Sequence, residues 1–270
     1  MSVFVTMRKY LALACLLVLL TGCAGKKEPP ESGRTVLRVG TDATYPPFEM
    51  INTETGKPQG FDIDLMDAIC KVKGWTPEFV VTPFDGIIAG LTNYKYDAVI
   101  SAMTITPQRS VVVDFSHPYY AAGQTIAVPL TDTTTKSTAD LRGKRVGVQL
   151  GTTGEMMAKR LGGVEVFSYD NISAAFIDMA NGNLDAVLND YPTTLRYIKV
   201  HHDAKTVGKL LSSEFYGIAV RKHDSGLLES INQALDSLKH DGTFNTIQQK
   251  WFGDQPELEK LNPAGDSTGD

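Results

Sequence analysis

Short apolar runs alternate with stretches of helical periodicity from residue 36 to residue 252. Strands that alternate with amphipathic helices are typical of α/β proteins with parallel sheets. The clearest helix runs from Phe61 to Lys73, because Leu65, Ile69 and Val72 recur on one of its faces. The same pattern predicts strands at 36–40, 78–82, 96–101, 145–150, 164–169 and 184–189, and helices at 86–91, 154–161, 173–181, 227–238 and 244–252.

One short motif occurs twice. Asp97-Ala98-Val99-Ile100 and Asp185-Ala186-Val187-Leu188 each follow a predicted helix and each lead into polar residues, Ser101 to Thr104 in the first case and Asn189-Asp190 in the second. Ligands of open α/β sheets bind beyond the carboxyl ends of the strands. The repeat therefore predicts two similar lobes whose strand ends face one cleft.

Two extended segments are candidates for the crossings between these lobes, Gln124 to Pro129 and Tyr216 to Arg221. A chain that goes out and comes back through two such segments permits hinge closure. Lobe 1 is expected to comprise residues 35–122 plus 216–255, and lobe 2 residues 123–215, with a flexible tail at 256–270.

The segment Gly151 to Glu155 reads GTTGE and follows the apolar run Val146 to Leu150. A strand, a Gly/Thr turn and a helix start present a cluster of free backbone N–H groups, and such a cluster binds anions. A P-loop would need lysine after its second glycine, where this chain has Glu155, and the dinucleotide spacing G-x-G-x-x-G is absent here. The turn is therefore predicted to hold a small anion.

Charged side chains follow both copies of the repeated strand. Arg109 comes five residues after Thr104, and the hydroxyls of Ser101 and Thr104 lie near it in sequence. Arginine binds a carboxylate through two parallel hydrogen bonds, so Arg109 is a candidate ligand clamp, with a structural surface arginine as the alternative. Asp190 is placed to accept from an ammonium group, or to cap the helix that begins before Pro192.

Two aromatic residues stand beside prolines in loops that follow strands, Tyr45 before Pro46 and Phe84 after Pro83. They are predicted to enclose a flat or aliphatic ligand side chain, with a cation–π contribution for a cationic one. The alternative is that both rings belong to the core.

A series of sequence motifs in one order carries a resemblance that covers residues 36–254. The motifs are GTD with YPPF (40–42, 45–48), GFDIDL (60–65), FDGII (84–88), TIT with Arg109 (104–106), DFS with PYY (114–116, 118–120), GTT (151–153), DAV (185–187) and DGT with WF (241–243, 251–252). With them the chain resembles the extracytoplasmic solute-binding proteins of polar-amino-acid ABC transporters, family 3. That resemblance implies the α/β type II periplasmic-binding-protein fold, with two lobes joined by a two-segment hinge.

The resemblance also implies how an amino acid would be held. Arg109, the Thr104 side chain and the backbone amides of Thr152 or Thr153 are expected to bind its α-carboxylate, which would be the small anion of the GTTGE turn. Asp190 is expected to bind the α-ammonium group.

A backbone carbonyl near Ala102 would help Asp190, and Tyr45 and Phe84 would flank the ligand side chain. Asp42 and Asp62 are expected at the far end of that side chain, although Asp62 is also placed to cap its own helix.

Two distal carboxylates favour arginine, lysine or histidine as the ligand, because an acidic side chain would meet repulsion. Asp42 and Asp62 also resemble positions in glutamine-binding members, and these can carry lysine where this chain has Gln149. Gln149 therefore favours a basic amino acid, and glutamine is the alternative.

The N-terminus predicts export. Arg8 and Lys9 precede an apolar run from Tyr10 to Leu20 that is too short to span a bilayer, as in a signal peptide. The run ends in Leu20-Thr21-Gly22-Cys23, which resembles the bacterial lipobox, so residues 1–22 are expected to be removed, Cys23 lipidated and residues 23–34 a tether. An ordinary cleavage site with a chance cysteine is the alternative. The protein is thus expected to be lipid-anchored to a bacterial membrane, in the periplasm or on the cell surface.

Charge and cysteine content narrow the partners. Loss of Arg8 and Lys9 with the signal changes the formal net charge from −5 to −7, which disfavours nucleic acid as a partner. Cys70 is the one cysteine of the expected folded part, so we expect it to pack and no intrachain disulfide to form. The spacing of the histidines suggests no metal site, and no cofactor is expected.

The resemblance implies a monomeric binding protein that closes around a free L-amino acid and delivers it to an ABC permease, with no catalytic residues. One alternative is a periplasmic cyclohexadienyl or arogenate dehydratase-like enzyme, for which Glu49, Glu155 and Glu214 are the candidate acids or bases. The other is a sensor domain, which we disfavour because no signalling segment follows Trp251.

Overall fold

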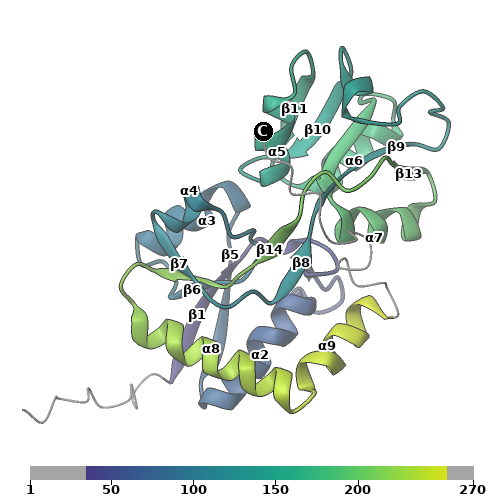
Figure 1. The fold of residues 1–270 in the computed structure, drawn as a ribbon. Helices are drawn as coiled ribbons and strands as arrows, with labels where there is room; N and C mark the ends of the chain where they lie inside the picture. Colours follow the sequence, from purple (N-terminus) through teal and green to yellow (C-terminus); the bar gives the residue numbers. More distant parts are fainter. Residues whose placement is uncertain (1–34, 254–270) are drawn as a thin grey trace, which may run out of the picture. The chain divides into compact units, whose positions relative to one another are not determined.

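The computed structural model describes residues 35–253. It contains two α/β lobes, each built on a five-stranded sheet (Figure 1). The lobe 1 sheet has the order β5-β1-β6-β15-β7, and the lobe 2 sheet the order β11-β10-β12-β9-β13. The strands of lobe 1 are β1 (Val36–Thr41), β5 (Thr76–Val81), β6 (Ala98–Val99), β7 (Val113–Phe115) and β15 (Ala219–Arg221). Those of lobe 2 are β9 (Gln124–Pro129), β10 (Arg145–Gln149), β11 (Glu165–Tyr169), β12 (Ala186–Asp190) and β13 (Ala204–Val207).

Helices cover the sheets. In lobe 1, α2 packs against both α8 and α9, while α3 contacts β1 and β6 (Figure 1). In lobe 2, α5, α6 and α7 all contact β12. The helices are α2 (Phe61–Lys73), α3 (Phe84–Thr92), α4 (Pro107–Ser110), α5 (Thr153–Arg160), α6 (Ile172–Ala180), α7 (Tyr191–His201), α8 (Ser225–His240) and α9 (Thr243–Phe252). The predicted α/β class is confirmed, and the predicted helices and strands lie within a few residues of those observed. The sheets are mixed rather than parallel as predicted, because β15 in lobe 1 and β9 in lobe 2 run antiparallel to their neighbours.

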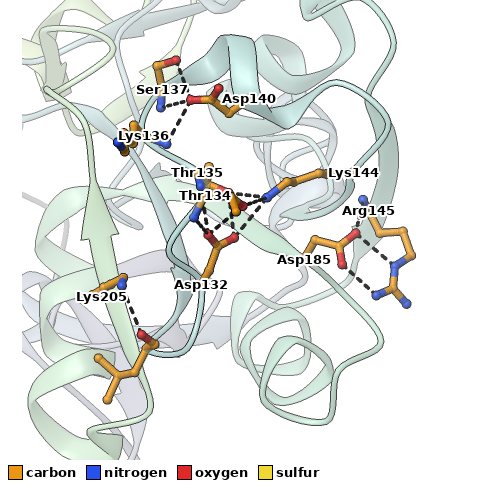
Figure 2. Close-up of polar contacts among 11 residues, drawn as sticks. Asp132, Thr134, Thr135, Lys136, Ser137, Asp140, Lys144, Arg145, Asp185 and Lys205 are labelled. Atoms are coloured by element: carbon orange, nitrogen blue, oxygen red, sulfur yellow. Dashed lines mark hydrogen bonds and ion pairs between the residues drawn. The ribbon is translucent and has the colours of Figure 1, made fainter.

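The two sheets are built alike around the repeated motif. Asp97 accepts from the backbone N–H of Arg38 at 3.1 Å and from its guanidinium, and Asp185 accepts from the same groups of Arg145, the backbone N–H at 2.8 Å. Figure 2 shows the Asp185–Arg145 pair. In the sheet order of both lobes the aspartate precedes the third strand, β6 or β12, and its partner arginine stands near the start of the second, β1 or β10. The repeated motif therefore marks two strands that hold the same position in their sheets, β6 in lobe 1 and β12 in lobe 2.

The connection between the lobes is a two-stranded antiparallel sheet of β8 (Tyr120–Ala122) and β14 (Glu214–Tyr216), which run side by side between them (Figure 1). The crossings expected at 124–129 and 216–221 are wrong, because β9 pairs inside the lobe 2 sheet and β15 inside the lobe 1 sheet. An extended apolar pattern is the same in a crossing segment and in a central strand. The true crossings lie a few residues earlier in both cases.

A cluster of aromatic rings packs under this hinge. The Phe48 ring centroid lies 4.8 Å from that of Tyr120 on β8 and 5.2 Å from that of Tyr216 on β14. Phe252 at the end of α9 lies 5.2 Å from Phe48 and 4.8 Å from Tyr120. Phe48 belongs to the loop before β3, in a small sheet of β2 (Thr44–Tyr45), β3 (Glu49–Ile51) and β4 (Pro58–Gln59). Both hinge strands are thus anchored on the core of lobe 1.

One aspartate organises the loop that follows β9. Asp132 accepts from the backbone N–H of Thr134 at 2.6 Å and of Thr135 at 2.8 Å, and from Lys144 Nζ at 3.0 Å (Figure 2). The backbone and hydroxyl donors of Thr135 and the ammonium of Lys144 hold the pKa of Asp132 well below its ordinary value. The short helix η1 (Thr138–Leu141) follows, closed by a capping box between Ser137 and Asp140. This carboxylate therefore serves the fold of its own loop.

Cys70 is fully buried in α2, as expected for a packing residue. Between residues 35 and 253, no helix is both long and apolar enough to cross a membrane. The expected signal peptide, Cys23 and the tether lie outside the described residues, as does the tail.

Two glycines make room for one buried tyrosine. Tyr96 donates its hydroxyl to the carbonyl of Ile87 at 2.5 Å, and its ring crosses Gly40 of β1 and Gly90 of α3. A methyl group at Gly90 would lie 2.2 Å from the Tyr96 hydroxyl, whereas a methyl group at Gly86 of the same helix would meet no atom within 4 Å.

We predict that Gly90→Ala destabilises the fold by about 1–3 kcal/mol through overpacking. Gly86→Ala is the matched control and should be neutral or stabilising by up to ~1 kcal/mol, because alanine is the better helix former. Thermal unfolding of both variants measures this. Equal melting temperatures for the two variants would contradict the packing described for Tyr96.

Candidate functional site

A small cavity lies between the lobes, at the carboxyl ends of both sheets. The empty space among its lining residues, open solvent included, is about 280 Å³. Residues of both lobes line it, namely Asp42, Tyr45, Phe84, Ser101, Ala102, Thr104, Arg109, Gln149, Thr152, Thr153 and Asp190. Sequence reasoning named all eleven as candidate ligand-binding residues. The structure thus brings them together around one space, and their roles toward a ligand stay predictions.

Arg109 spans the cavity between the lobes. Its Nη1 donates to the carbonyl of Thr104 at 2.7 Å and its Nη2 to the carbonyl of Gly151 at 3.0 Å. The guanidinium lies over the Phe84 ring, 5.2 Å from the ring centroid. Burial lowers the pKa of Arg109 to about 10, against the opposing effect of Asp190 and Glu214, so the group is a cation at neutral pH. A guanidinium has five N–H donors, so donors remain for a ligand.

Local structure holds Arg109 in place. It belongs to the short helix α4, whose N-cap Thr106 accepts from the Arg109 backbone N–H at 3.2 Å, and Pro107 occupies the first turn. The cation therefore projects from a rigid turn at the end of the strand that delivers Ser101 and Thr104.

Asp190 is the opposite charge on the lobe 2 wall. It ends β12 and precedes α7, yet its side chain makes no capping hydrogen bond, so the helix-cap interpretation is wrong. Its carboxylate accepts from Gln124 Nε2 and from the Tyr216 hydroxyl. Burial raises the pKa of Asp190 to about 7, the nearby Glu214 adds to this, and the hydrogen bonds oppose it. A buried carboxylate with a raised pKa gains most from a cationic partner.

Asp42 is the second acid of the cavity. It accepts from Gln149 Nε2 of lobe 2 at 3.0 Å and from the Thr44 hydroxyl of its own loop. Burial raises its pKa, and these two hydrogen bonds oppose the shift. Tyr45 makes a second direct bond between the lobes, since its hydroxyl donates to Asn189 Oδ1 at 2.7 Å. Tyr45 is buried rather than half-exposed, and it still reaches the cavity.

The GTTGE turn closes on its own glutamate. Glu155 accepts from the Gly151 N–H at 2.9 Å and from Ser168 Oγ at 2.6 Å, and it pairs with Lys159 at 2.8 Å. The Thr152 hydroxyl caps α5 by accepting from the Glu155 N–H at 3.2 Å. The backbone amides at the start of α5 form the positive end of the helix dipole, which favours an anion. Glu155 itself lies outside the cavity lining.

Asp62 is the one predicted site residue that does not line the cavity. Its side chain is fully buried behind the wall, where Oδ2 accepts from the Ala102 N–H at 2.7 Å and from the Tyr119 hydroxyl at 3.0 Å. It does not cap α2 either, because the N-cap residue of that helix is Gly60 and no side chain makes a capping hydrogen bond there. The expected contact with the far end of a ligand is therefore replaced by a supporting position behind Ala102.

Sequence reasoning missed the structural role of Glu214. This buried carboxylate on β14 accepts at Oε2 from the hydroxyls of Thr104 at 2.7 Å and of Thr153 at 2.8 Å, one from each lobe. Its Oε1 accepts from Ser212 at 2.8 Å. Because each hydroxyl has one proton, Thr104 and Thr153 can only accept at the cavity. The Thr104 hydroxyl is thus unsuited to the expected carboxylate and suited to an ammonium group.

Sequence reasoning also missed Gln124, because its partners lie far away in the sequence. Its Nε2 donates to Asp190 and to Thr153 Oγ1 at 3.1 Å, so one amide ties two cavity residues together. The partners lie 66 and 29 residues away, and no local motif marks them.

In the described part of the chain no group of three His, Cys, Asp or Glu residues is arranged to hold a metal ion.

Comparison with known proteins places this arrangement. The signature of the family described as "Bacterial extracellular solute-binding proteins, family 3" matches residues 37–254, and the chain belongs to that family. It is 38% identical to "ABC transporter arginine-binding protein 1" of Escherichia coli (strain K12), over 90% of this chain and 99% of that protein.

Solved structures agree in fold. An ancestral arginine-binding protein bound to arginine is similar at a TM-score of 0.79 and 49% identity, over 82% of this chain and 99% of that one. An ancestral arginine-binding protein bound to glutamine is similar at a TM-score of 0.79 and 50% identity, over 82% of this chain and 99% of that one. An ancestral amino acid-binding protein described as a precursor of cyclohexadienyl dehydratase has a TM-score of 0.76 and 42% identity, over 80% and 95%. The type II periplasmic-binding-protein fold predicted from sequence is confirmed.

We predict that Glu214→Gln lowers the stability of the ligand-free protein by about 1–2 kcal/mol. Glutamine has one acceptor oxygen, so at least one of the three hydroxyl donors of Thr104, Thr153 and Ser212 loses its partner. Glu78→Gln, the same change at an exposed strand position, is the control and should change little. Chemical denaturation compares the two variants, and a Glu214→Gln protein as stable as the control would show that these bonds do not hold the hinge.

Proposed function

We propose that this protein captures an L-amino acid with a basic side chain between its lobes and delivers it to the permease of an ABC importer. The observation that carries the proposal is the pairing of Arg109 and Asp190 on the walls of one cavity that also contains Asp42. A free amino acid has a carboxylate and an ammonium group separated by one carbon atom, and these two walls offer the complementary charges.

The α-carboxylate would lie against Arg109 and the first turn of α5. Two guanidinium donors are occupied by carbonyls, and the remaining ones form the fork that binds a carboxylate. The amides of Thr152 and Thr153 stand at the N-terminal end of α5, where the helix dipole favours negative charge.

The α-ammonium group would lie between Asp190 and the Thr104 hydroxyl, with the Ala102 region supplying a carbonyl. The Thr104 hydroxyl presents a lone pair because its proton goes to Glu214. An ammonium beside Asp190 favours the ionised carboxylate, which lowers a pKa that stands at about 7 without ligand. Binding near or below neutral pH therefore releases a proton, and affinity rises with pH up to that value.

The charge of the cavity favours a cationic side chain. Its lining carries two carboxylates, Asp42 and Asp190, against one guanidinium. The α-groups of an amino acid cancel each other, so a positively charged side chain near Asp42 offsets the excess negative charge. Tyr45 and Phe84 would flank the aliphatic part. The relative named as an arginine-binding protein supports this choice, and the ancestral protein solved with glutamine keeps glutamine as the alternative.

Binding would close the hinge. We infer that lobe 1 comprises residues 35–122 plus 216–255 and lobe 2 residues 123–215, as the two sheets and the β8–β14 connection support. A ligand that contacts both walls favours the closed state, because only that state makes both sets of contacts. The closed monomer would then dock on the permease.

Binding rather than catalysis fits the placement of the candidate acids. None of Glu49, Glu155 and Glu214 lines the cavity as the structure describes it. Glu155 is bound by Lys159 and Ser168, Glu214 lies behind two threonines, and Glu49 is fully buried. The likeness to an ancestor of a dehydratase is the one observation in favour of an enzyme.

We further propose that the protein is exported, processed at Cys23 and held on a bacterial membrane surface by lipid on that residue. The lipobox-like Leu20-Thr21-Gly22-Cys23 after a short apolar run supports this. Each buried CH₂ of the acyl chains contributes ~0.8 kcal/mol to membrane binding, so several chains hold the protein firmly.

Titration calorimetry with single amino acids tests the ligand. We expect arginine, lysine or histidine to bind at least about tenfold more tightly than glutamine, and Asp42→Asn to reduce that preference by roughly tenfold, or ~1.4 kcal/mol. Asp236→Asn removes a charge from the exposed part of α8 and should leave the preference unchanged. Tighter binding of glutamine would overturn the assignment of Asp42, and no heat with any amino acid would favour the enzyme.

Cell fractionation tests the anchor. The wild-type protein should fractionate with membranes and incorporate a labelled fatty acid, and Cys23→Ser should do neither, because the serine offers no thiol to the lipid. Cys70→Ser is the matched control and should keep both properties. Incorporation of the label by Cys23→Ser would contradict the proposal.

A further inference from the structure

Two fully buried carboxyl groups meet behind the cavity wall in lobe 1. Glu49 belongs to β3 and Asp62 to α2, and both side chains have an exposed fraction of zero. The backbone N–H of Asp62 donates at 2.9 Å to the carbonyl of Phe48, the residue before Glu49, and each carboxyl group influences the pKa of the other. Neither lines the cavity, so the amino-acid-binding proposal leaves the pair without a role.

The hydrogen bonds of the pair are unevenly divided. Glu49 Oε1 accepts from Ser101 Oγ at 2.7 Å, and Asp62 Oδ2 accepts from the Ala102 N–H and the Tyr119 hydroxyl. The other two oxygens, Glu49 Oε2 and Asp62 Oδ1, are buried and have no donor. Buried polar atoms without a partner are rare in folded proteins, so two in adjoining groups require an explanation.

A proton between these two oxygens satisfies both at once. Two ionised carboxylates in contact inside a protein repel strongly, and burial adds the cost of removing each charge from water. The charged and titratable groups that act on the pair are Asp42 and Tyr119, and neither is a cation. With one proton, Glu49 Oε2–H donates to Asp62 Oδ1, and every other hydrogen bond of the pair stays as it is.

We propose that Glu49 and Asp62 share a single proton and that this carboxyl–carboxylate pair positions the cavity residues Ser101 and Ala102. The Ser101 hydroxyl donates to Glu49 and accepts from the Asp42 N–H at 3.0 Å, so the pair also orders the loop that carries Asp42. Ala102 has a φ of 44°, a left-handed conformation that costs energy for any residue with a side chain. The Asp62 carboxylate holds its N–H in that conformation.

The shared proton makes the cavity wall sensitive to rising pH. Burial raises the pKa of Asp62 to about 6 and that of Glu49 well above its ordinary range. Because the folded state holds the proton more tightly than the unfolded state, the stabilisation is present at acidic pH and is lost as the pH rises through the folded-state pKa values. Loss of the proton places a second charge beside Asp62 and near Asp42, and weakens the support of Ser101 and Ala102.

Infrared spectroscopy of the purified protein with ¹³C-labelled glutamate tests the proton directly. We expect a carbonyl band of a protonated glutamic acid at pH 7 that shifts with the label and is absent in Glu49→Gln. The label separates this signal from Asp190, whose pKa of about 7 gives an aspartic acid band. A spectrum in which wild type and Glu49→Gln show the same labelled bands at pH 7 would overturn the proposal.

Conservative substitution tests the positioning role. Glu49→Gln reproduces the protonated group, since its oxygen accepts from Ser101 and its Nε2 donates to Asp62. At pH 7 its melting temperature should stay close to that of wild type, and its affinity should lie within about twofold of the wild-type value. Its stability should no longer decline as the pH rises. Glu49→Ala leaves Ser101 and Asp62 unpaired and should weaken ligand binding at all pH values. The shared proton would be contradicted by a Glu49→Gln protein that behaves like Glu49→Ala, or by one whose stability still declines with rising pH as in wild type.

The binding arm of this test uses L-arginine and therefore rests on the proposed function, whereas the infrared and unfolding arms use no ligand. Failure of wild type to bind arginine, together with the expected infrared band and the flattened pH profile, would reject the ligand and keep the pair. The reverse pattern would reject the pair and keep the ligand.

Discussion

A buried guanidinium group connects the two lobes of this protein. Arg109 gives one hydrogen bond to a carbonyl of lobe 1 and one to a carbonyl of lobe 2, while its face lies on the Phe84 ring. A cation in such a place is costly unless anions surround it. Asp190 and Glu214 supply that charge, the first on the cavity wall and the second behind it. The need to compensate Arg109 thus explains why so many acids gather at one point of the cleft.

The architecture delivers these charges in a simple way. Two sheets of the same strand order turn their carboxyl ends toward each other, and the aspartate–arginine pairs Asp97–Arg38 and Asp185–Arg145 mark the equivalent strands. The first repeated strand leads to Ser101, Thr104 and Arg109, and the second ends in Asp190. The hinge strands β8 and β14 rest on the aromatic cluster around Phe48 of lobe 1. Tyr216 and Glu214 bring the hinge itself into contact with the site.

Sequence reasoning reached the cavity lining because these residues stand at or shortly after the ends of strands, which local pattern can locate. Asp190 ends β12, whereas Tyr45 and Phe84 follow β1 and β5 within a few residues. Arg109 lies further from its strand, in the short helix α4. It failed for Glu214 and misplaced Asp62, because their roles depend on partners 110 and 40 residues away. The crossing segments were placed a few residues too late because β9 and β15 have the same extended apolar pattern as a crossing segment. The expected lobe limits at 122/123 and 215/216 stay predictions. The roles of the lining residues toward a ligand, and the lipid on Cys23, remain predictions.

The central claim is that the two walls bind the two α-groups of one amino acid. Calorimetry with three ligands of identical guanidinium side chain tests it: L-arginine, agmatine, which lacks the carboxylate, and 5-guanidinopentanoic acid, which lacks the ammonium. Loss of one partner of a buried charge pair costs about 2–5 kcal/mol, so each analogue should bind roughly 30-fold or more weakly than arginine. Agmatine or the acid binding as tightly as arginine would contradict the assignment of Arg109 or of Asp190.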